Sequence, residues 1–345
     1  MKVQKQQHVK RRSWTTGLGL LLTVVLLAVF SSTVLAAGPY DGQDGPLAVS
    51  TIDTLNLTDA KRDRTIPVKI YYPDGPGPFP IVLYSHGLGG SKDGKRYLGK
   101  YWASHGYIGI FMTHFGSDRS VTDSKLPFNS PENKARLRAA TKPQSTFNRP
   151  WDVTAVIDGL DFIEQQVDAL KGRMDHQRIA VTGHSYGSMT VMLSAGGYAQ
   201  QARALGHQFR DDRPRAFIAM SPRPAGPRGN PDAIWSEIDR PMMTMTGGND
   251  TDPIGAGING ETRKQPFEKM PPGDKYLLWL DGAYHWTFGD ATKNRQPEAA
   301  HHLAIKAASL AFLDAYLKDS PDAKKFLTSG AIGQLTGNSA TITCK

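Results

Sequence analysis

The stretch Gly183-His184-Ser185-Tyr186-Gly187 places a serine between two glycines, where an apolar run ends and a helical pattern begins. A serine hydroxyl is a weak nucleophile until a base removes its proton. In a Gly-x-Ser-x-Gly turn between a strand and a helix, larger neighbours would clash and the serine oxygen projects above the sheet. The pattern therefore predicts Ser185 as a nucleophile; the alternative is a structural serine in a tight turn.

We expect the base to be His285. Histidine has an unperturbed pKa near neutrality, and in this architecture the histidine follows the last strand of the order Ser, Asp or Glu, His. His285 follows the apolar run 275–282 and is flanked by turn residues. The other candidates are expected at strand ends where they line a pocket (His86, His114), beside Ser185 but pointing away (His184), or within a helix as surface or packing residues (His301, His302).

The acid should hold the imidazole in the correct tautomer and follow a strand between the serine and the histidine. The segment MMTMTGGNDTDPIG offers Asp250 and Asp252. Asp250 comes first after the strand and the glycine turn and is preferred, with Asp252 kept as the alternative. Asp281, only four residues before His285, is a distant third candidate.

Acyl transfer also needs N–H donors for the oxyanion that develops in the transition state. Tyr186 follows the nucleophile at a helix start and supplies one backbone N–H. The second is expected from Leu88, in the glycine-rich loop 84–94 after an early strand. A plain turn between strand and helix is the alternative reading of that loop.

No cofactor and no metal ion are expected. The sequence has no HExxH or CxxC motif, and His301 and His302 are adjacent and so point in different directions. The stretch HGLGG (86–90) lacks the lysine and Ser/Thr of a phosphate-binding P-loop.

The elements that position these residues alternate along the chain. Continuous apolar runs predict strands buried on both faces, and the intervening helical patterns predict an α/β fold with a mostly parallel sheet covered by helices on both sides. We expect one domain over residues 37–345. The predicted strands cover 66–73, 79–87, 107–116, 178–185, 216–222, 241–248 and 275–282, and the predicted helices cover 96–106, 150–171 and 297–319.

Residues 117–149 carry no clear periodicity and hold seven basic and three acidic residues. This segment is expected to be either a lid or pocket wall, or a solvated surface loop. Its basic residues would favour anionic ester substrates. Five aromatic residues are candidates for an apolar acyl pocket or for the core: Phe115, Phe128, Trp235, Trp286 and Phe288.

Residues 1–36 have a basic start, an apolar run over 17–30 and small residues before Ala36, which predicts a cleaved signal peptide; a retained membrane anchor is the alternative. The protein is then exported, periplasmic or secreted, by the Sec route or, given RRSW, the twin-arginine route.

The chain after residue 36 holds 36 basic and 32 acidic residues, a net charge of +4 that does not favour binding of nucleic acid. The single cysteine, Cys344, is expected as a free thiol in a tail.

The chain resembles exported α/β-hydrolases, and more narrowly bacterial proteins of the dienelactone-hydrolase-like and platelet-activating-factor-acetylhydrolase-like group. The resemblance covers roughly residues 45–320 and is carried by LYSHGLGGS, NRPWDVTAVID, VTGHSYGSMTVM, TGGNDTDPIG and PPGDKYLLWLDGAYHWTFGD. It implies the α/β-hydrolase fold, Ser185 as nucleophile, His285 as base, Asp250 as acid, and the Leu88 and Tyr186 amides as the oxyanion hole.

Two departures limit what the resemblance implies. Dienelactone hydrolases use a cysteine nucleophile, where this chain has Ser185. Acetylhydrolases take their acid after the strand that follows the nucleophile helix, and here that place reads AMSPRPAG, without an acid. Neither lactone nor phospholipid specificity therefore carries over.

The expected function is hydrolysis of carboxylic esters by a serine esterase through an acyl-enzyme. The alternatives are an amidase, a peptidase or an acyltransferase with the same triad, and a non-catalytic binding protein. The expected partner is a small-molecule or lipid-like ester, with no nucleic acid and no stable membrane span after signal cleavage. The sequence leaves the oligomeric state open.

Overall fold

The structure, a computed structural model, describes residue 38 and residues 40–226, 229–255 and 257–345. The predicted signal peptide, residues 1–36, lies outside them. In these ranges no helix combines the length and the apolar character needed to cross a membrane.

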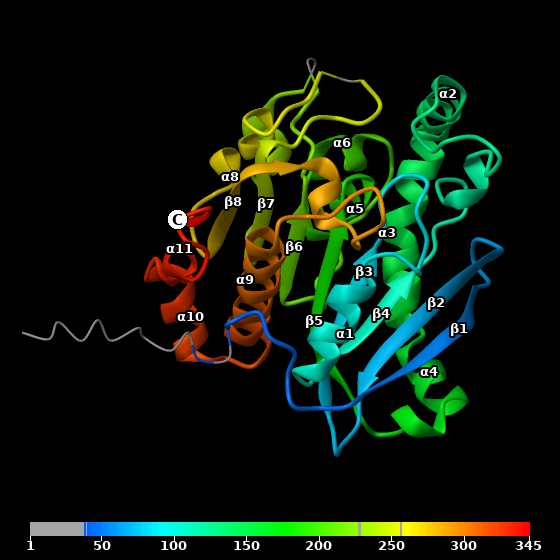
Figure 1. Cartoon of the computed structure of the whole chain (residues 1–345). Helices are drawn as coiled ribbons and strands as arrows, with labels where there is room; N and C mark the ends of the chain where they lie inside the picture. Colours follow the sequence, from blue (N-terminus) through cyan, green and yellow to red (C-terminus); the bar gives the residue numbers. More distant parts are fainter. Residues whose placement is uncertain (1–37, 39, 227–228, 256) are drawn as a thin grey trace, which may run out of the picture. The chain divides into compact units, whose positions relative to one another are not determined.

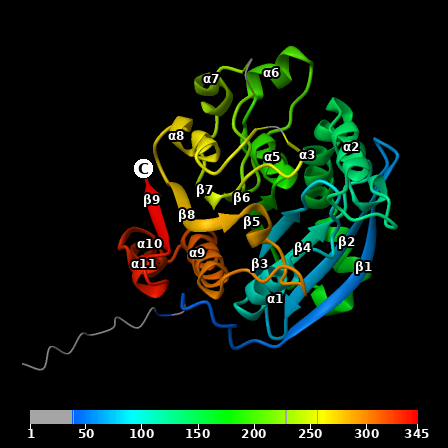
Figure 2. The ribbon, with the colours of Figure 1, turned by 45° about the horizontal axis from the view of Figure 1, so that its top comes forward.

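A nine-stranded sheet runs through the described part of the chain in the order β1-β2-β4-β3-β5-β6-β7-β8-β9. The six strands from β4 to β8 in that order are parallel, while β1, β2 and β9 pair antiparallel at the edges. Strands β1 and β9 lie at opposite edges (Figures 1 and 2). The strands are β1 (Val49–Asp59), β2 (Arg64–Pro73), β3 (Phe79–Ser85), β4 (Ile108–Met112), β5 (Met174–His184), β6 (Ala216–Met220), β7 (Met242–Asn249), β8 (Lys275–Tyr284) and β9 (Ala340–Cys344).

The α-helices are α1 (Arg96–Ser104), α2 (Pro131–Ala140), α3 (Pro143–Asp158), α4 (Leu160–Gln166), α5 (Tyr186–Ala195), α6 (Ala199–Ala204), α7 (Pro231–Trp235), α8 (Gln265–Lys269), α9 (Ala299–Leu317), α10 (Pro321–Thr328) and α11 (Ala331–Leu335). Short 3₁₀ turns lie between them: η1 (Arg119–Val121), η2 (Asp168–Leu170), η3 (Thr262–Lys264) and η4 (His285–Phe288).

Two apolar cores cover the two faces of the sheet, because successive strand residues point to opposite sides. In β3, Val82 and Tyr84 join the core that contains α1 and α9, whereas Ile81 and Leu83 join the core that contains α3 and α5. Figure 1 shows α1 and α9 on the near face and α3 and α5 behind. The expected α/β class, with helices on both faces of a mostly parallel sheet, is confirmed.

The predicted apolar runs form strands β2 to β8, but the helix predicted over 150–171 begins earlier and is broken. Helix α3 starts at Pro143, not Pro150, and Pro150 lies inside it. Gly159 separates α3 from α4, and η2 follows. Proline is tolerated in the first turn of a helix. Pro143 occupies that turn in α3, so the predicted helix start at Pro150 was wrong.

Residues 117–149 are not one irregular loop, as the sequence indicated. They contain η1, α2 and the first half of α3. The buried side chain of Asn133 holds the segment together, because its amide donates to Asp123 O and Pro127 O at 3.0 Å each and its oxygen accepts from Asp123 N at 2.7 Å. Asparagine bonds of this kind leave no periodic apolar signal.

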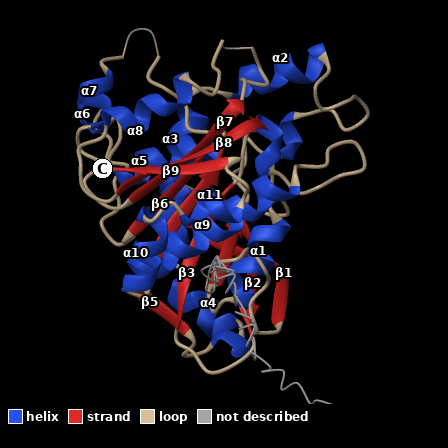
Figure 3. Ribbon diagram, turned by 60° about the vertical axis from the view of Figure 1, so that its left-hand side comes forward, coloured by secondary structure: helices blue, strands red, loops and turns tan. Residues whose placement is uncertain are grey.

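The chain from α9 onwards returns to the sheet. After α10 and α11, strand β9 pairs with β8 at the edge, as Figure 3 shows. Cys344 is a free and exposed thiol, but it lies in β9, so its placement in a tail was wrong. Strands β1 and β9 were both missed because edge strands carry few continuous apolar residues.

We predict that Phe312→Ala lowers the free energy of unfolding by about 3–5 kcal/mol, the usual loss for a buried phenylalanine. Phe312 of α9 is fully buried and packs edge-on against Tyr276 of β8, with ring centroids 5.8 Å apart. The control is Phe162→Ala, on α4, whose side chain is 43% exposed. Urea unfolding of both variants measures the difference, and equal losses would contradict the packing described.

Candidate active site

Ser185 occupies the turn between β5 and α5. Its backbone has φ 58° and ψ −117°, a conformation unfavourable for a non-glycine residue. A side chain on Gly187 would collide with the Ser85 carbonyl of β3, and one on Gly183 with the Gly187 carbonyl. The two flanking glycines are therefore required by close backbone approach.

The predicted base and acid lie next to this serine. His285 Nε2 is 2.8 Å from Ser185 Oγ, and His285 Nδ1 is 2.7 Å from Asp250 Oδ1. Asp250 Oδ2 accepts a hydrogen bond from Thr246 Oγ1 at 2.9 Å. The residues follow β5, β7 and β8, whose carboxyl ends meet at one edge of the parallel sheet. Asp252 lies further along the loop and lines the cavity.

Arg263, of η3, sets the electrostatics of this pair. Its Nε donates to Asp250 O at 2.9 Å and lies 3.2 Å from Asp250 Oδ1, and its Nη1 donates to Ser221 O at 3.0 Å. Burial by itself raises the pKa of Asp250, but the His285 hydrogen bond and the Arg263 charge outweigh it, so that pKa is lowered. Asp250 is therefore ionised beside the ring of His285.

The pKa of His285 is also lowered from its ordinary value of 6.5. Burial is the largest cause, and the charges of Arg263 and Lys95 act in the same direction, against the opposing effect of Asp250. The imidazole is consequently neutral at pH 7, which is the state a general base must start from.

Three further histidines support the loop that carries His285. His301 Nε2 lies 2.7 Å from Asp281 O, and His302 Nε2 lies 3.0 Å from both Thr287 O and Gly289 O. His184 Nε2 lies 3.1 Å from His285 O. Because carbonyl oxygens only accept, each of these rings donates from Nε2. His301 and His302 are thus packing residues, one of the roles expected of them.

The two residues predicted to supply the oxyanion amides belong to the wall of the cavity that contains Ser185. Leu88 and Tyr186 both line it. Among the described residues, neither the Leu88 nor the Tyr186 backbone N–H has a hydrogen-bond partner. Gly87 lies so close that a side chain there would come 3.3 Å from Ser185 Cβ. Both N–H groups are thus unpaired on residues that line the cavity, and their role as an oxyanion hole stays a prediction.

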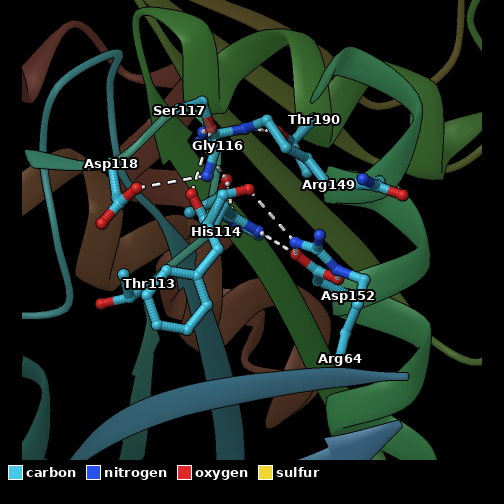
Figure 4. A network of polar contacts seen from close by, with 12 residues as sticks. Arg64, Thr113, His114, Gly116, Ser117, Asp118, Arg149, Asp152 and Thr190 are labelled. Atoms are coloured by element: carbon cyan, nitrogen blue, oxygen red, sulfur yellow. Dashed lines mark hydrogen bonds and ion pairs between the residues drawn. The ribbon is translucent and has the colours of Figure 1, made fainter. Parts of the chain in front are cut away.

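A second Ser-His-Asp arrangement lies buried beneath the Leu88 loop. Ser85 Oγ is 2.9 Å from His114 Nε2, and His114 Nδ1 is 2.9 Å from Asp152 Oδ2. Burial and the charge of Arg149 lower the pKa of His114 to about 4. Figure 4 shows His114 and Asp152 facing each other beside Arg64, which donates to Asp152. All three members are fully buried, so no substrate reaches Ser85 in this conformation.

The expectation that His114 lines the pocket was wrong, whereas His86 does line it.

Arg149 of α3 connects this buried group to the two segments that carry Leu88 and Tyr186. Its guanidinium donates to Ser85 Oγ at 3.0 Å, to Ser117 Oγ at 2.7 Å and to His86 O, in the loop that carries Leu88. The same group lies 4.8 Å from the centroid of the Tyr186 ring. One buried cation therefore contacts the loop after β3 and the start of α5.

The cavity above Ser185 has a volume of about 410 Å³. Of the predicted aromatic residues only Phe128 and Trp286 line it; Trp235 and Phe288 are fully buried in the core, and Phe115 is exposed elsewhere. From the segment 117–149, the cavity is lined by Phe128, Asn129, Lys134, Leu137 and Thr141, so this segment forms part of its wall. Only one of the segment's seven basic residues, Lys134, is among them.

Sequence reasoning missed Arg149, Arg263 and Lys95. In the sequence each stands among other charged or polar residues, which is the usual pattern of a solvated surface. Their burial results from the tertiary arrangement of the loops and could not be read from local patterning. In the part of the chain that the structure describes, no cluster of three or more His, Cys, Asp or Glu side chains is arranged to hold a metal ion.

The chain is similar to platelet-activating factor acetylhydrolases and to cutinases. It is 23% identical to the acetylhydrolase of Bos taurus and 25% identical to that of Cavia porcellus, each over 69% of this chain. It is 27% identical to cutinase 2 of Thermobifida cellulosilytica over 63% of this chain. The alignments span 57%, 58% and 64% of these relatives, less than two thirds of each. No family model matches the sequence.

Asp250→Asn is expected to lower kcat for ester substrates by about 10⁴-fold, because an amide no longer fixes the imidazole tautomer or stabilises its cation. The matched control is Asp281→Asn, whose carboxylate accepts from Trp279 Nε1 at 2.7 Å. Steady-state kinetics of the two variants compare the carboxylates. Equal activity of the two variants would show that Asp250 is not the acid that supports His285.

The pH profile of kcat/KM should have its acidic midpoint below 6.5. The pKa of His285 is lowered from 6.5, so the neutral base persists to lower pH, and activity is lost as pH falls through that lowered pKa. Initial rates with a neutral ester between pH 4 and pH 9, roughly the range where histidine titrates, give the midpoint. A midpoint above 6.5 would contradict the balance of charges around His285.

Proposed function

From the premise that the chain belongs to the α/β-hydrolase superfamily, we propose that it is a serine hydrolase of carboxylic esters. One observation carries the proposal: hydrogen bonds run from Ser185 through His285 to Asp250 at the edge of a cavity. The names of the relatives, acetylhydrolase and cutinase, support ester hydrolysis as the reaction class.

In the proposed reaction Ser185 Oγ attacks the ester carbonyl carbon while His285 Nε2 accepts its proton. The carbonyl oxygen becomes an oxyanion, which the Leu88 and Tyr186 N–H groups stabilise by hydrogen bonds. When the intermediate collapses, the C–O bond to the alcohol breaks and His285 donates its proton to the leaving oxygen. Asp250 stabilises the imidazolium throughout and keeps its own charge.

The second half of the reaction repeats these roles with water. His285 removes a proton from a water molecule, which attacks the acyl carbon bound to Ser185. The oxyanion again lies at the two backbone amides, and Ser185 leaves with the proton from His285. The products are the free acid and the alcohol, and the enzyme regains its starting protonation state.

We also propose that the enzyme acts outside the cytoplasm as a single domain over residues 37–345. The support is the sequence of residues 1–36, with its basic start and its apolar run. No residue of the proposed site belongs to that segment.

Ser185→Ala should lower kcat for p-nitrophenyl esters by about 10⁴-fold or more, as loss of a serine nucleophile does in other triads. Ser194→Ala serves as the control, because Ser194 lies in α5, the helix that follows Ser185, and its buried hydroxyl has no hydrogen-bond partner in the described structure. Near-native turnover by Ser185→Ala would contradict the proposal.

The same assay should include a p-nitroanilide and an added alcohol acceptor. Hydrolysis of the anilide at rates close to those of the ester, or predominant transfer to the alcohol, would assign the triad to amide hydrolysis or to acyl transfer instead.

A further inference from the structure

Lys95 is a buried amine without a partner. The residue is 7% exposed and directly precedes α1. Among the described residues, its Nζ has neither a hydrogen-bond acceptor nor an ion-pair partner. Removing an ammonium group from water is unfavourable unless it is paired, and burial accordingly lowers the pKa of Lys95 to about 7. The protein nevertheless keeps this lysine at its candidate active site.

The backbone of Lys95 adds to that cost. Its φ of 58° and ψ of 36° lie in the left-handed region, which is unfavourable for residues other than glycine, asparagine and aspartate. Its side chain makes no capping bond to α1. Neither helix capping nor an ion pair therefore explains a lysine at this position.

The Lys95 side chain lines the cavity that contains Ser185 and His285. Its Nζ lies beside Gly289, in the loop after His285, where a Cβ atom added to that glycine would come 3.7 Å from it. The Lys95 charge also lowers the pKa of His184 and of His285, so Lys95 is close enough to act on the proposed base. Lys95 Nζ is thus placed beside the cavity wall, and binding of an anionic group there would favour its charged form.

The other charges around the cavity compensate Lys95 only in part: the charge of Asp290 raises the pKa of Lys95, but burial outweighs it. Asp290 lines the cavity, but its Oδ1 accepts from Tyr97 N at 3.1 Å, and no ion pair joins Asp290 to Lys95 among the described residues. Arg263 is bound to Asp250. Cations outnumber carboxylates on the wall, which includes Lys95, Lys134, Arg223, Arg263 and Arg295 but only Asp252 and Asp290.

Lys92, three residues before Lys95, has a structural role. Lys92 Nζ donates to Asp53 O at 2.7 Å and forms an ion pair with Asp93 at 3.3 Å. It does not line the cavity. The two lysines are three residues apart, but only Lys92 has its donors occupied.

We infer that Lys95 binds a negatively charged group of the substrate, and that the enzyme prefers esters that carry a carboxylate in addition to the ester bond. The inference rests on the proposed ester hydrolysis. A carboxylate brought to Lys95 Nζ would supply the missing partner and form a charge-assisted hydrogen bond in a partly dehydrated site. A neutral ester of the same length would leave the ammonium unpaired.

The test uses two p-nitrophenyl esters of adipic acid, one with the second carboxyl free and one with it methylated. Wild-type protein should show the higher kcat/KM with the free acid. Lys95→Met should lower kcat/KM for the free acid by roughly 10- to 100-fold, mainly through KM, the range of a charge-assisted hydrogen bond. The loss for the methyl ester should be at least about fivefold smaller, because that substrate experiences only the indirect effect of the Lys95 charge on the pKa of His285.

Lys92→Met is the matched control, since it removes the same charge from the same loop, and it should leave both substrates unaffected. Turnover of the methyl ester reports that each variant is folded. Absence of a wild-type preference for the free acid, or an equal loss on both substrates in Lys95→Met, would overturn the inference. Failure of ester hydrolysis itself appears separately, as loss of the Ser185 dependence with the methyl ester.

Discussion

The close approach of β3, β5 and the start of α5 is the constraint on which the rest of the site depends. Gly183 and Gly187 allow the backbone of the turn to lie against the Ser85 carbonyl, and Ser185 is then held at a positive φ. Its hydroxyl projects into the cavity instead of packing in the core. Because the strands are parallel, the loops after β7 and β8 end at the same edge, where Asp250 and His285 meet it.

The structure contains two sets of serine, histidine and aspartate with nearly equal Ser–His and His–Asp distances, but only one of the two serines lies in that turn. In the first set Ser185 faces the cavity; in the second, Ser85 is fully buried and accepts a hydrogen bond from Arg149. The residue types and the distances are alike, so they do not by themselves define a reactive serine. Access to the cavity and nearby free N–H donors distinguish the first set.

Buried cations tune the site from two sides. Arg263 keeps the carboxylate of Asp250 charged and opposes protonation of His285. Arg149 holds the loop after β3 and contacts the ring of Tyr186, a residue that lines the cavity. Arg263 thus affects the charge of Asp250 and His285, whereas Arg149 affects the position of the loop after β3.

The sequence was sufficient to predict the α/β class, strands β2 to β8 and the residues that the structure brings together around Ser185. Those predictions succeeded because continuous apolar runs and a glycine-flanked serine are local patterns. The folded segment 117–149 was missed because the bonds from Asn133 to nearby backbone leave no periodic apolar pattern. The edge strand β9 was missed because it pairs with β8, which is distant in the sequence. Arg149, Arg263 and Lys95 were missed for the same reason: burial of a charge is a property of the tertiary structure.

The claim that this turn, and not the mere presence of a triad, makes a serine reactive can be tested by covalent labelling. The wild-type protein would be incubated with diethyl p-nitrophenyl phosphate, in which a serine oxygen displaces p-nitrophenolate from phosphorus, and then digested for mass spectrometry. The account predicts one diethylphosphoryl group per chain, on Ser185, with Ser85 unmodified. A label on Ser85, or an unlabelled Ser185 in folded protein, would contradict it.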